Sequence, residues 1–238
     1  MNILRLMRTV SHSFDSMFSI TRTSIVSEYS GFVQSLNLKD STVLDTGTGN
    51  ELHYDAEGKN NLIMVDCDAR TLHYNNYAGY KIAADISSIP IKSSTVDCCT
   101  SCFVMEHLPR PDDTIDEISR VSKRGGIAVI LFASKNALFS ILARILPEKI
   151  KEWLLVLTDN HHKHGFKTYY RYCSLSQMGL LLEEKGFNIK YRSVNYFSAP
   201  YYDFLPPMYF LMLTIESLLD ITGLSKFASY VFIIAEKN

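Results

Sequence analysis

The sequence predicts an α/β fold, a doubly wound and mostly parallel β-sheet with helices on both of its faces. Strand-like and helix-like segments alternate along the chain after an N-terminal helical region, as they do in proteins built from parallel strands and crossover helices. The first strand, within residues 43–50, ends in a turn that contains Gly47 and Gly49. Folds of this class hold nucleotide-like ligands at such a strand and turn.

Length and composition favour one globular domain. The chain has 238 residues, of which 47% are hydrophobic and 21% charged, so it can bury a full core. A net charge of −1 implies no general affinity for polyanions, and nucleic acid is not an expected partner. The five cysteines are an odd number without paired zinc-site spacing. They indicate buried thiols in a reducing, cytoplasmic compartment, and we expect no metal.

The N-terminal region is predicted to be an amphipathic helix. Arg5 and Arg8 interrupt the apolar core that a signal peptide needs, and no stretch reaches the roughly 20 apolar residues that span a bilayer. A transit segment over residues 1–14 is the alternative, because this stretch contains no acid. Helical spacing places five apolar side chains on one face, which we expect to form a lid over the ligand: Ile3, Met7, Val10, Phe14 and Met17.

Apolar runs and turn residues predict the elements of the first half. The expected strands are 42–44, 62–65, 80–83, 96–101 and 127–132, with helices at 50–56 and 68–77. A further helix is expected to begin at Pro111, since proline is favoured at the first helical position. It should run to about Ser122, with Gly125 and Gly126 as a left-handed stop.

The second half is predicted to be a helical and aromatic cap with two further strands. Apolar stripes predict helices near 138–146 and 150–157, a third is expected from Ser174 to Gly186, and Pro206 opens a fourth that reaches about residue 219. The expected strands are 188–194 and 230–235. The predicted division is 1–38 for the helical lid, 40–132 for the ligand-binding core, 133–228 for the cap and acceptor region with the sixth strand, and 229–238 for the last strand.

Acids follow three successive strands. Asp45 ends the first strand, Asp66 ends the second, and Asp85 follows the third with Ile86 beside it. The carboxyl ends of parallel strands meet at one edge of the sheet, where ligands bind in open α/β folds. An acid at the second position can accept both ribose hydroxyls, and a carboxylate beside an apolar side chain suits an adenine. Each acid alone could equally be a helix N-cap, but three in register favour a nucleoside ligand.

Asp45 distinguishes between cofactors. Turns that hold a pyrophosphate have the spacing G-x-G-x-x-G, and Leu52 stands here at the third glycine position. A carboxylate beside the turn would also repel a pyrophosphate, which disfavours a nicotinamide-dependent oxidoreductase. The cationic amino group and sulfonium of S-adenosyl-L-methionine match Asp45 better, so this is the predicted cofactor.

These motifs together resemble the class I S-adenosylmethionine-dependent methyltransferases. They are similar to the small-molecule subgroup that contains the ubiquinone, menaquinone and sterol-type enzymes. The resemblance covers about residues 40–132 and rests on residues 43–50, 64–66, 84–86, 89–90, 96–97, 101–108 and 120–126. It implies a Rossmann-like, seven-stranded sheet whose last strand is antiparallel, and a transferase that releases S-adenosyl-L-homocysteine. Arg124 departs from the usual proline of the family, which puts the geometry of that turn in question.

The resemblance also implies roles for individual residues. Asp45 would hold the amino group of the methionine part, while Gly47 and Gly49 let the cofactor lie against the turn. Asp66 would bind the ribose hydroxyls, with Cys67 beside the adenine.

Further implied contacts come from the third and fourth strands. Asp85 would accept a hydrogen bond from the adenine amine, and Ile86 would pack on the adenine face. Ser101 and Cys102, at the end of the fourth strand, would line the cofactor near the methyl group.

Three histidines are tentative catalytic residues: His107, His161 and His164. A neutral imidazole can take a proton from an acceptor. Packing is the favoured alternative for His107, and a solvated loop for the other two, whose spacing does not match zinc sites. Methyl transfer from a sulfonium is an in-line displacement that gains rate from alignment, so a strong base is not required.

The aromatic composition of the cap favours a small hydrophobic acceptor, such as a quinone, an isoprenoid, a lipid or a secondary metabolite. A lipid-like acceptor would bring peripheral contact with a membrane. Three alternatives are open: the aromatic residues form the core of the cap, the acceptor is a sugar or glycan precursor, or the protein is an inactive cofactor-binding scaffold. The residues concerned are Phe139, Trp153, Tyr196, Phe197, Tyr201, Tyr202, Phe204, Tyr209 and Phe210.

Overall fold

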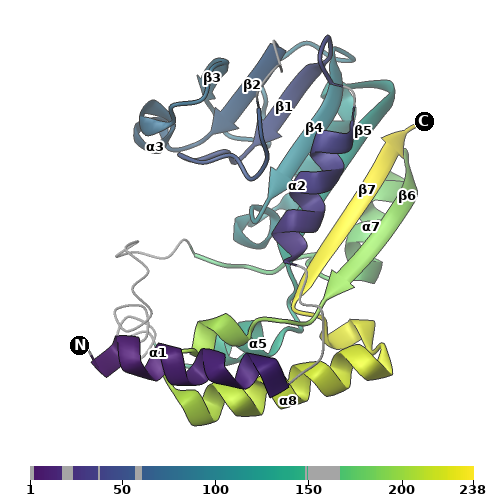
Figure 1. Cartoon of the computed structure of the whole chain (residues 1–238). Helices are drawn as coiled ribbons and strands as arrows, with labels where there is room; N and C mark the ends of the chain where they lie inside the picture. The colour runs from purple at the N-terminus through teal and green to yellow at the C-terminus, as the bar shows by residue number, and fades with distance from the viewer. Residues whose placement is uncertain (1–2, 18–23, 37, 57–60, 148, 150–166) are drawn as a thin grey trace.

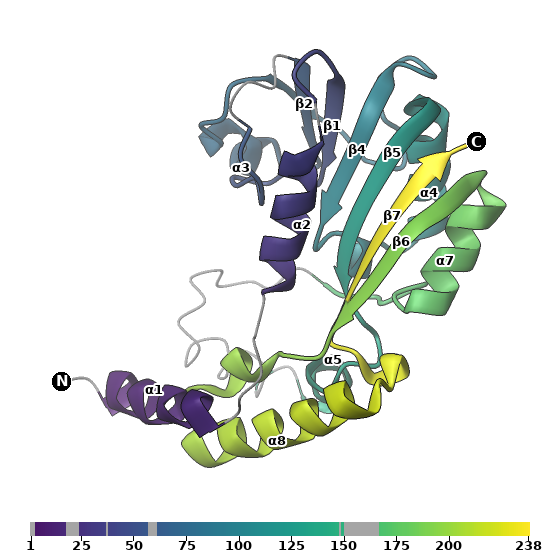
Figure 2. The ribbon, with the colours of Figure 1, turned by 45° about the vertical axis from the view of Figure 1, so that its right-hand side comes forward.

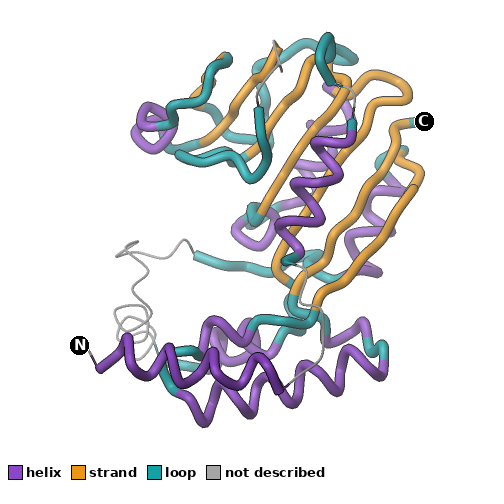
Figure 3. Tube along the Cα trace, in the orientation of Figure 1, coloured by secondary structure: helices purple, strands orange, loops and turns teal. Residues whose placement is uncertain are grey.

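The computed structural model describes residues 3–17, 24–36, 38–56, 61–147, 149 and 167–238. These residues form one seven-stranded sheet of order β3-β2-β1-β4-β5-β7-β6, with helices on both faces and beyond one edge (Figures 1 and 3). β7 is antiparallel to β5 and β6, and the other neighbouring strands are parallel. The predicted doubly wound sheet with an antiparallel last strand is confirmed.

The elements have the following bounds. The strands are β1 (Thr42–Thr46), β2 (Asn61–Asp66), β3 (Tyr80–Ala83), β4 (Val96–Cys102), β5 (Ser122–Ala133), β6 (Phe187–Asn195) and β7 (Tyr230–Lys237). The helices are α1 (Ile3–Ser13), α2 (Ile25–Ser35), α3 (Ala69–Tyr74), α4 (Pro111–Val121), α5 (Leu138–Ile145), α7 (Leu175–Glu184) and α8 (Pro206–Thr222). Short 3-10 turns are η1 (Phe14–Met17), η2 (Met105–His107), η3 (Ala199–Tyr202) and η4 (Ser225–Phe227).

Both faces of the sheet are buried, because successive strand side chains point to opposite faces. Val43 of β1 packs in the core on the α2 side, and Leu44 packs in the core on the other side. Helix α2 covers the first face with Ile25, Tyr29 and Val33, while α4 and α7 cover the second (Figure 2). Burial of each such side chain contributes about 1.5–3 kcal/mol, so packing holds these helices on the sheet.

Two local predictions are wrong. Residues 50–56 form turns and bends rather than a helix, because Leu52 and Tyr54 both reach the core at a spacing of two residues, which does not match a helical stripe. Helix α4 ends at Val121 without a left-handed glycine, since Ser122 takes an extended conformation and begins β5 directly. Gly125, with φ +76°, lies within that strand.

The cap lies beyond the carboxyl edge of the parallel strands and contains α1, α5, η3 and α8 (Figures 1 and 2). Helix α1 lies along α8 in both views and is held there by polar contacts. Ser11 is buried and donates to the Asp203 carbonyl oxygen at 2.7 Å, and Arg8 pairs with the Asp203 carboxylate. The predicted apolar face of α1 is therefore only partly buried: Ile3 and Val10 remain 68% and 41% exposed. Its role as a lid over the ligand stays a prediction.

Candidate functional site

The glycine turn after β1 is fixed by both conformation and space. Gly47 and Gly49 have φ of +70° and +56°, a region that favours glycine. The Gly47 amide donates to the Val65 carbonyl oxygen at 2.7 Å. A Cβ atom at Gly47 would lie 2.4 Å from Cγ2 of Val104. The turn is thus held between the end of β2 and the side chain of Val104, which packs on Gly47 from the segment that follows β4.

Asp45 is a buried carboxylate at the base of this turn. Its Oδ2 accepts a hydrogen bond from Thr100 Oγ1 at 2.6 Å, and its carbonyl oxygen accepts one from Thr48 Oγ1 at 3.1 Å. Burial raises the pKa of Asp45 to about 6, although hydrogen bonds from Thr100, Thr48 and Tyr54 oppose the shift. Because desolvation destabilises the anion, a cationic ligand group beside this carboxylate would be strongly favoured.

Asp66 braces the turn from the neighbouring strand. Its Oδ2 accepts from the Gly49 amide and its Oδ1 from the Asp68 amide, both at 2.8 Å. A carboxylate oxygen has a second lone pair, so each atom can also accept a hydroxyl hydrogen bond. Asp68, which caps α3, accepts from the Arg70 and Thr71 amides, so the helix-cap role falls to Asp68 rather than to Asp66.

Asp85 and Ile86 take different positions after β3. Asp85 is exposed and accepts from the Ser87 amide and hydroxyl, both at 2.8 Å, which lowers the pKa of Asp85. Ile86 is buried in the core beside α4, which leaves little of its side chain to cover an adenine. Cys67 is exposed at the surface. Its partial burial has the largest effect in raising the pKa of its thiol, and the charges of Asp66 and Asp85 raise this pKa further.

The register of the sheet brings the three acids to one edge. β3, β2 and β1 are adjacent in that order, and Asp45, Asp66 and Asp85 lie at or just after their carboxyl ends. The charges of Asp45 and Asp66 interact, and Cys67 lies within the influence of Asp66 and Asp85. The predicted juxtaposition therefore exists.

The end of β4 contributes polar groups next to the turn. Ser101 is buried, and its hydroxyl has no hydrogen-bond partner among the described residues. Cys102 is half-buried, and burial followed by the charges of Asp45 and Glu106 raises the pKa of its thiol. An unpartnered buried hydroxyl costs free energy unless a ligand satisfies it, so Ser101 is suited to contact a bound molecule.

These groups fit S-adenosyl-L-methionine. The glycine backbone leaves room for the methionine chain, Asp45 supplies an anion for its cationic groups, and Asp66 supplies acceptors for two hydroxyls. Asp85 supplies a hydrogen-bond acceptor for the adenine amine, although the burial of Ile86 weakens the expected contact between Ile86 and the adenine face. When bound, the cofactor supplies an electrophilic methyl group on a sulfonium.

Glu106, which the sequence pairs with His107, is a buried acid in η2. It is 4% exposed, and burial raises its pKa to about 7. Its Oε1 accepts from the Ala133 amide at 3.4 Å, while its Oε2 has no partner among the described residues. The motif pattern drew attention to His107, and the burial that distinguishes Glu106 could only be seen in the fold.

Of the three predicted catalytic histidines, only His107 is among the described residues. Nδ1 of His107 lies 3.1 Å from the Lys167 carbonyl oxygen at the surface. His161 and His164 lie outside the described residues. In the part of the chain that is described, no three His, Cys, Asp or Glu side chains gather as metal ligands.

Five aromatic rings form a row along the carboxyl edge. Ring centroids lie 6.1 Å apart for His53 and Phe103, 5.6 Å for Phe103 and Tyr230, 5.8 Å for Tyr230 and Phe139, and 5.1 Å for Phe139 and Tyr201. The row joins the loop after β1 to β4, β7, α5 and η3. These rings are exposed or half-buried rather than sealed in the core. Of them, the sequence pattern pointed only to Phe139 and Tyr201.

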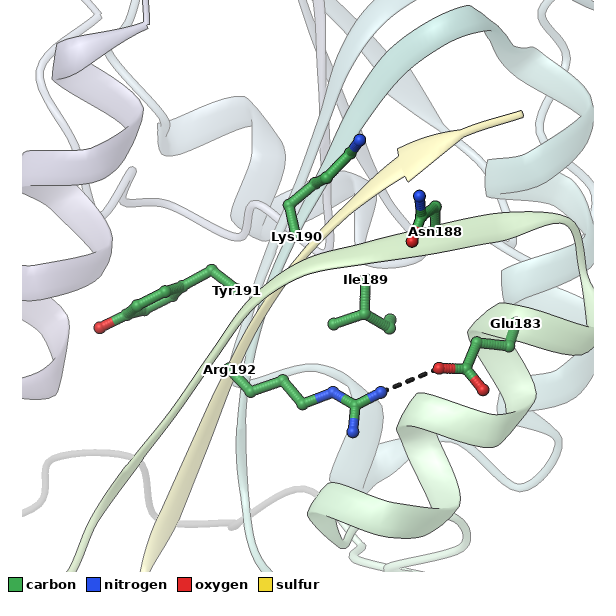
Figure 4. A pocket seen from close by; sticks show the side chains of 6 residues that line it. All are labelled: Glu183, Asn188, Ile189, Lys190, Tyr191 and Arg192. Carbon is green, nitrogen blue, oxygen red and sulfur yellow. Dashed lines mark hydrogen bonds and ion pairs between the residues drawn. The ribbon is translucent and has the colours of Figure 1, made fainter.

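A hollow of about 330 Å³ lies elsewhere, on the outer strand of the sheet (Figure 4). It is lined by Glu183, Asn188, Ile189, Lys190, Tyr191 and Arg192. Arg192 and Glu183 form an ion pair of 2.9 Å at its rim. β4, β5 and β7 stand between β6 and the glycine turn of β1, so this hollow is separate from the candidate site.

Among the helices of the described segments, none has the length and apolarity to cross a bilayer. The five cysteines carry no disulfide; Cys98, Cys99 and Cys173 are buried as expected, whereas Cys67 is exposed.

Part of the chain is similar to known methyltransferase sequences. Residues 44–130 match the family model of a methyltransferase domain. The chain is similar to an uncharacterised protein of Methanocaldococcus jannaschii, 27% identical over 72% of this chain and 66% of that one. It is also similar to an uncharacterised methyltransferase of Mycobacterium sp., 33% identical over 38% of each chain. The matches thus span less than two thirds of these curated relatives.

The fold is shared with solved structures. An S-adenosylmethionine-dependent methyltransferase from Thermotoga maritima superposes with a TM-score of 0.59 over 100% of both chains, at 15% identity. At this identity the likeness concerns the fold.

Proposed function

We propose that this chain, whose residues 44–130 match the family model of a methyltransferase domain, transfers the methyl group of S-adenosyl-L-methionine to a small, hydrophobic acceptor. The observation that carries the proposal is the register of Asp45, Asp66 and Asp85 on three adjacent strand ends beside the glycine turn. This arrangement offers one anion for the cationic head and two sets of acceptors for the nucleoside.

The proposed contacts divide between the two ends of the cofactor. Asp45 holds the amino group, with Gly47 and Gly49 against the methionine chain, and Asp66 binds the ribose hydroxyls. At the adenine end, the exposed Asp85 receives the amine, with Cys67 and Ile86 nearby. Ser101 and Cys102 face the methyl group from the end of β4. His107, His161 and His164 stay as proposed bases whose roles mutagenesis can assign.

The proposal of a hydrophobic acceptor rests on the cap. The aromatic row ends on α5 and η3, and it includes Phe103, which directly follows Ser101 and Cys102 in the chain. Alignment of acceptor and sulfonium, with exclusion of water, supplies much of the rate of an in-line displacement. A quinone, isoprenoid, lipid or secondary metabolite matches an apolar aromatic surface better than a sugar does, although a sugar can stack on tyrosine rings.

An acceptor dissolved in lipid would bring the protein to a membrane surface. Leu211, Leu218 and Ile221 of α8 are exposed on the cap, and they support such peripheral contact. Flotation with vesicles tests this: the wild type should float with the lipid, and a variant with Leu211→Ser and Leu218→Ser should not. A wild-type protein that stays at the bottom of the gradient would contradict membrane contact and leave the cofactor site untouched.

A screen with labelled cofactor separates an enzyme from an inactive scaffold. We expect label to pass from S-adenosyl-L-methionine into an organic-soluble product when the protein is incubated with lipid and metabolite extracts. The matched variant Asp66→Ala should give no labelled product. Binding of S-adenosyl-L-homocysteine without transfer to any extract would favour the scaffold.

A further inference from the structure

Glu106 lies where an acceptor would meet the cofactor. It follows Val104, whose side chain packs against Gly47 of the cofactor turn. Its charge and that of Asp45 both act on the thiol of Cys102, after the larger effect of burial. Both buried acids therefore lie near the Cys102 thiol, and Asp45 is the one that lies at the base of the cofactor turn.

The carboxylate of Glu106 is incompletely satisfied. Oε1 has a long hydrogen bond of 3.4 Å from the Ala133 amide, and Oε2 has none among the residues that the structure describes. A buried acceptor left without a partner destabilises the fold, and more strongly when it is charged. A purely structural residue at this point would be better served by an apolar side chain, so the unpaired oxygen suggests a ligand that donates to it.

Among the described residues, the groups on which the charge of Glu106 acts are hydroxyls and thiols. Its charge acts on groups of β4, β7, η3 and the segment before α7: Cys102, Tyr230, Tyr201, Tyr170 and Cys173. Lys135 acts on Cys173, and His107 follows Glu106 in the chain. Tyr201 and Tyr230 hydrogen-bond to each other. They also belong to the aromatic row, so the row passes beside the carboxylate.

From this geometry we infer that Glu106 is the proton acceptor of the reaction, and that the methyl acceptor is a flat molecule with an aromatic hydroxyl lying on the row of rings formed by His53, Phe103, Tyr230, Phe139 and Tyr201. The inference rests on the proposed function. It narrows the acceptor to a group that must lose a proton when it is methylated, and it assigns that proton to Oε2 of Glu106.

The step balances without another reactant. An oxygen lone pair of the acceptor forms the new C–O bond to the methyl carbon. The bond between that carbon and sulfur breaks, and its electron pair neutralises the sulfonium to a thioether. The hydroxyl proton passes to the ionised carboxylate of Glu106 and later leaves to solvent. Burial places the pKa of Glu106 at about 7, in the range where a general base is most effective.

Two matched probes test this inference: 1-naphthol, which must be deprotonated, and 1-naphthalenethiol, a far stronger acid that is already ionised in mildly alkaline solution. Initial rates with labelled cofactor are compared for wild type, Glu106→Gln and Glu216→Gln. Glu216 is a matched buried acid whose Oε1 accepts from the Ser198 amide and hydroxyl at 3.0 and 2.5 Å. Glu106→Gln should lower the rate with 1-naphthol about 10²-fold or more and leave the rate with 1-naphthalenethiol unchanged. Glu216→Gln should leave the rates with both probes unchanged.

The wild type provides a second readout that does not depend on folding of a variant. Its rate with 1-naphthol should rise as pH passes through about 7, because the carboxylate must be ionised, whereas its rate with the thiol should follow only the ionisation of the thiol itself, which is complete in mildly alkaline solution. An equal loss with both probes in Glu106→Gln would overturn the inference in favour of a structural role, as would no loss with either.

Failure of the inference and of the proposed function can be told apart. A wild-type protein that binds S-adenosyl-L-homocysteine and labels an extract, but methylates neither probe, contradicts the acceptor class alone. A protein that does not bind the cofactor product contradicts the proposed function itself.

Discussion

At the cofactor turn, a single residue can lower the stability of the free protein and at the same time favour binding of the cofactor. Desolvation raises the pKa of the buried Asp45 to about 6. The pH dependence of its contribution to stability is therefore opposite to that of a carboxylate whose pKa is lowered on folding. Its contribution to stability is full below the unfolded pKa of 3.8 and is lost as pH rises through about 6. At neutral pH the protein without cofactor therefore carries an unfavourable buried charge, which a cationic ligand would relieve.

Asp45→Asn is expected to make the cofactor-free protein more stable above about pH 6, by up to about 3 kcal/mol, because the ionisation is removed. The gain should vanish toward pH 4, where the wild-type carboxyl is protonated. Thermal and urea unfolding across this pH range measure the difference. A variant less stable than wild type at all pH values would show that the carboxylate serves the fold.

The same ionisation of Asp45 should make the affinity of the wild type for the cofactor depend on pH. Because the cofactor needs the ionised carboxylate, its dissociation constant should rise about tenfold for each pH unit below about 6. Titration of S-adenosyl-L-homocysteine at several pH values measures this. An affinity independent of pH would place the amino group away from Asp45.

Gly47 is expected to tolerate no side chain. Gly47→Ala should destabilise the protein by about 1–3 kcal/mol through its positive φ, and further through the 2.4 Å approach to Val104. The double variant Gly47→Ala, Val104→Ala should recover only the steric part. Urea unfolding separates the two contributions, and a Gly47→Ala protein as stable as wild type would contradict the turn geometry.

At the scale of elements, one arginine fastens α4 to the loop that precedes β4. The Arg120 guanidinium donates to the carbonyl oxygens of Ile89 and Ile91 at 2.8 Å and pairs with Glu117. Arg120→Lys keeps the charge but loses the planar fork. We expect a loss of about 1–3 kcal/mol in unfolding free energy with unchanged affinity for S-adenosyl-L-homocysteine. A matching loss of affinity would mean that this contact reaches the cofactor site.

Elements with strong local signals could be predicted from the sequence. Apolar runs identified the strands, and Ser174 and Gly186 correctly bounded α7. The segment 50–56 could not be predicted, since Leu52 and Tyr54 reach the core through a long-range contact from Tyr54 to Thr100. The polar attachment of α1 through Asp203 likewise depends on residues nearly two hundred positions apart.

At the scale of the whole molecule, the sheet and the cap differ in how they are held. The sheet lies between two extensive cores, whereas the buried hydrophobic cluster of the cap, within the described part of the chain, consists of Tyr209, Met212 and Leu213. Local opening should therefore be easier in the cap. Amides of α1 and α8 are expected to exchange with deuterium faster than those of β1, β4 and β5. Uniform exchange over the molecule would contradict this division.

The part of the candidate site on the sheet could be predicted from the sequence better than the part toward the cap. The juxtaposition of the three acids could be predicted because they recur at strand ends, and parallel strands bring such ends together. The burial of Glu106 and the aromatic row could not be predicted, because both depend on contacts between residues far apart in the chain, such as that of Phe103 with Tyr230 of β7. The match to the family model ends at residue 130, before α5 begins.

Calorimetric titration of S-adenosyl-L-homocysteine into the wild type, Asp45→Asn and Asp66→Ala tests the cofactor site most directly, with NAD as the competing ligand. We expect saturable one-to-one binding to the wild type, weakened about 10- to 100-fold in each variant as one charged contact is lost, and no competition by NAD. Preferential binding of NAD, or equal affinity in all three proteins, would contradict a cofactor held by the acids at these strand ends.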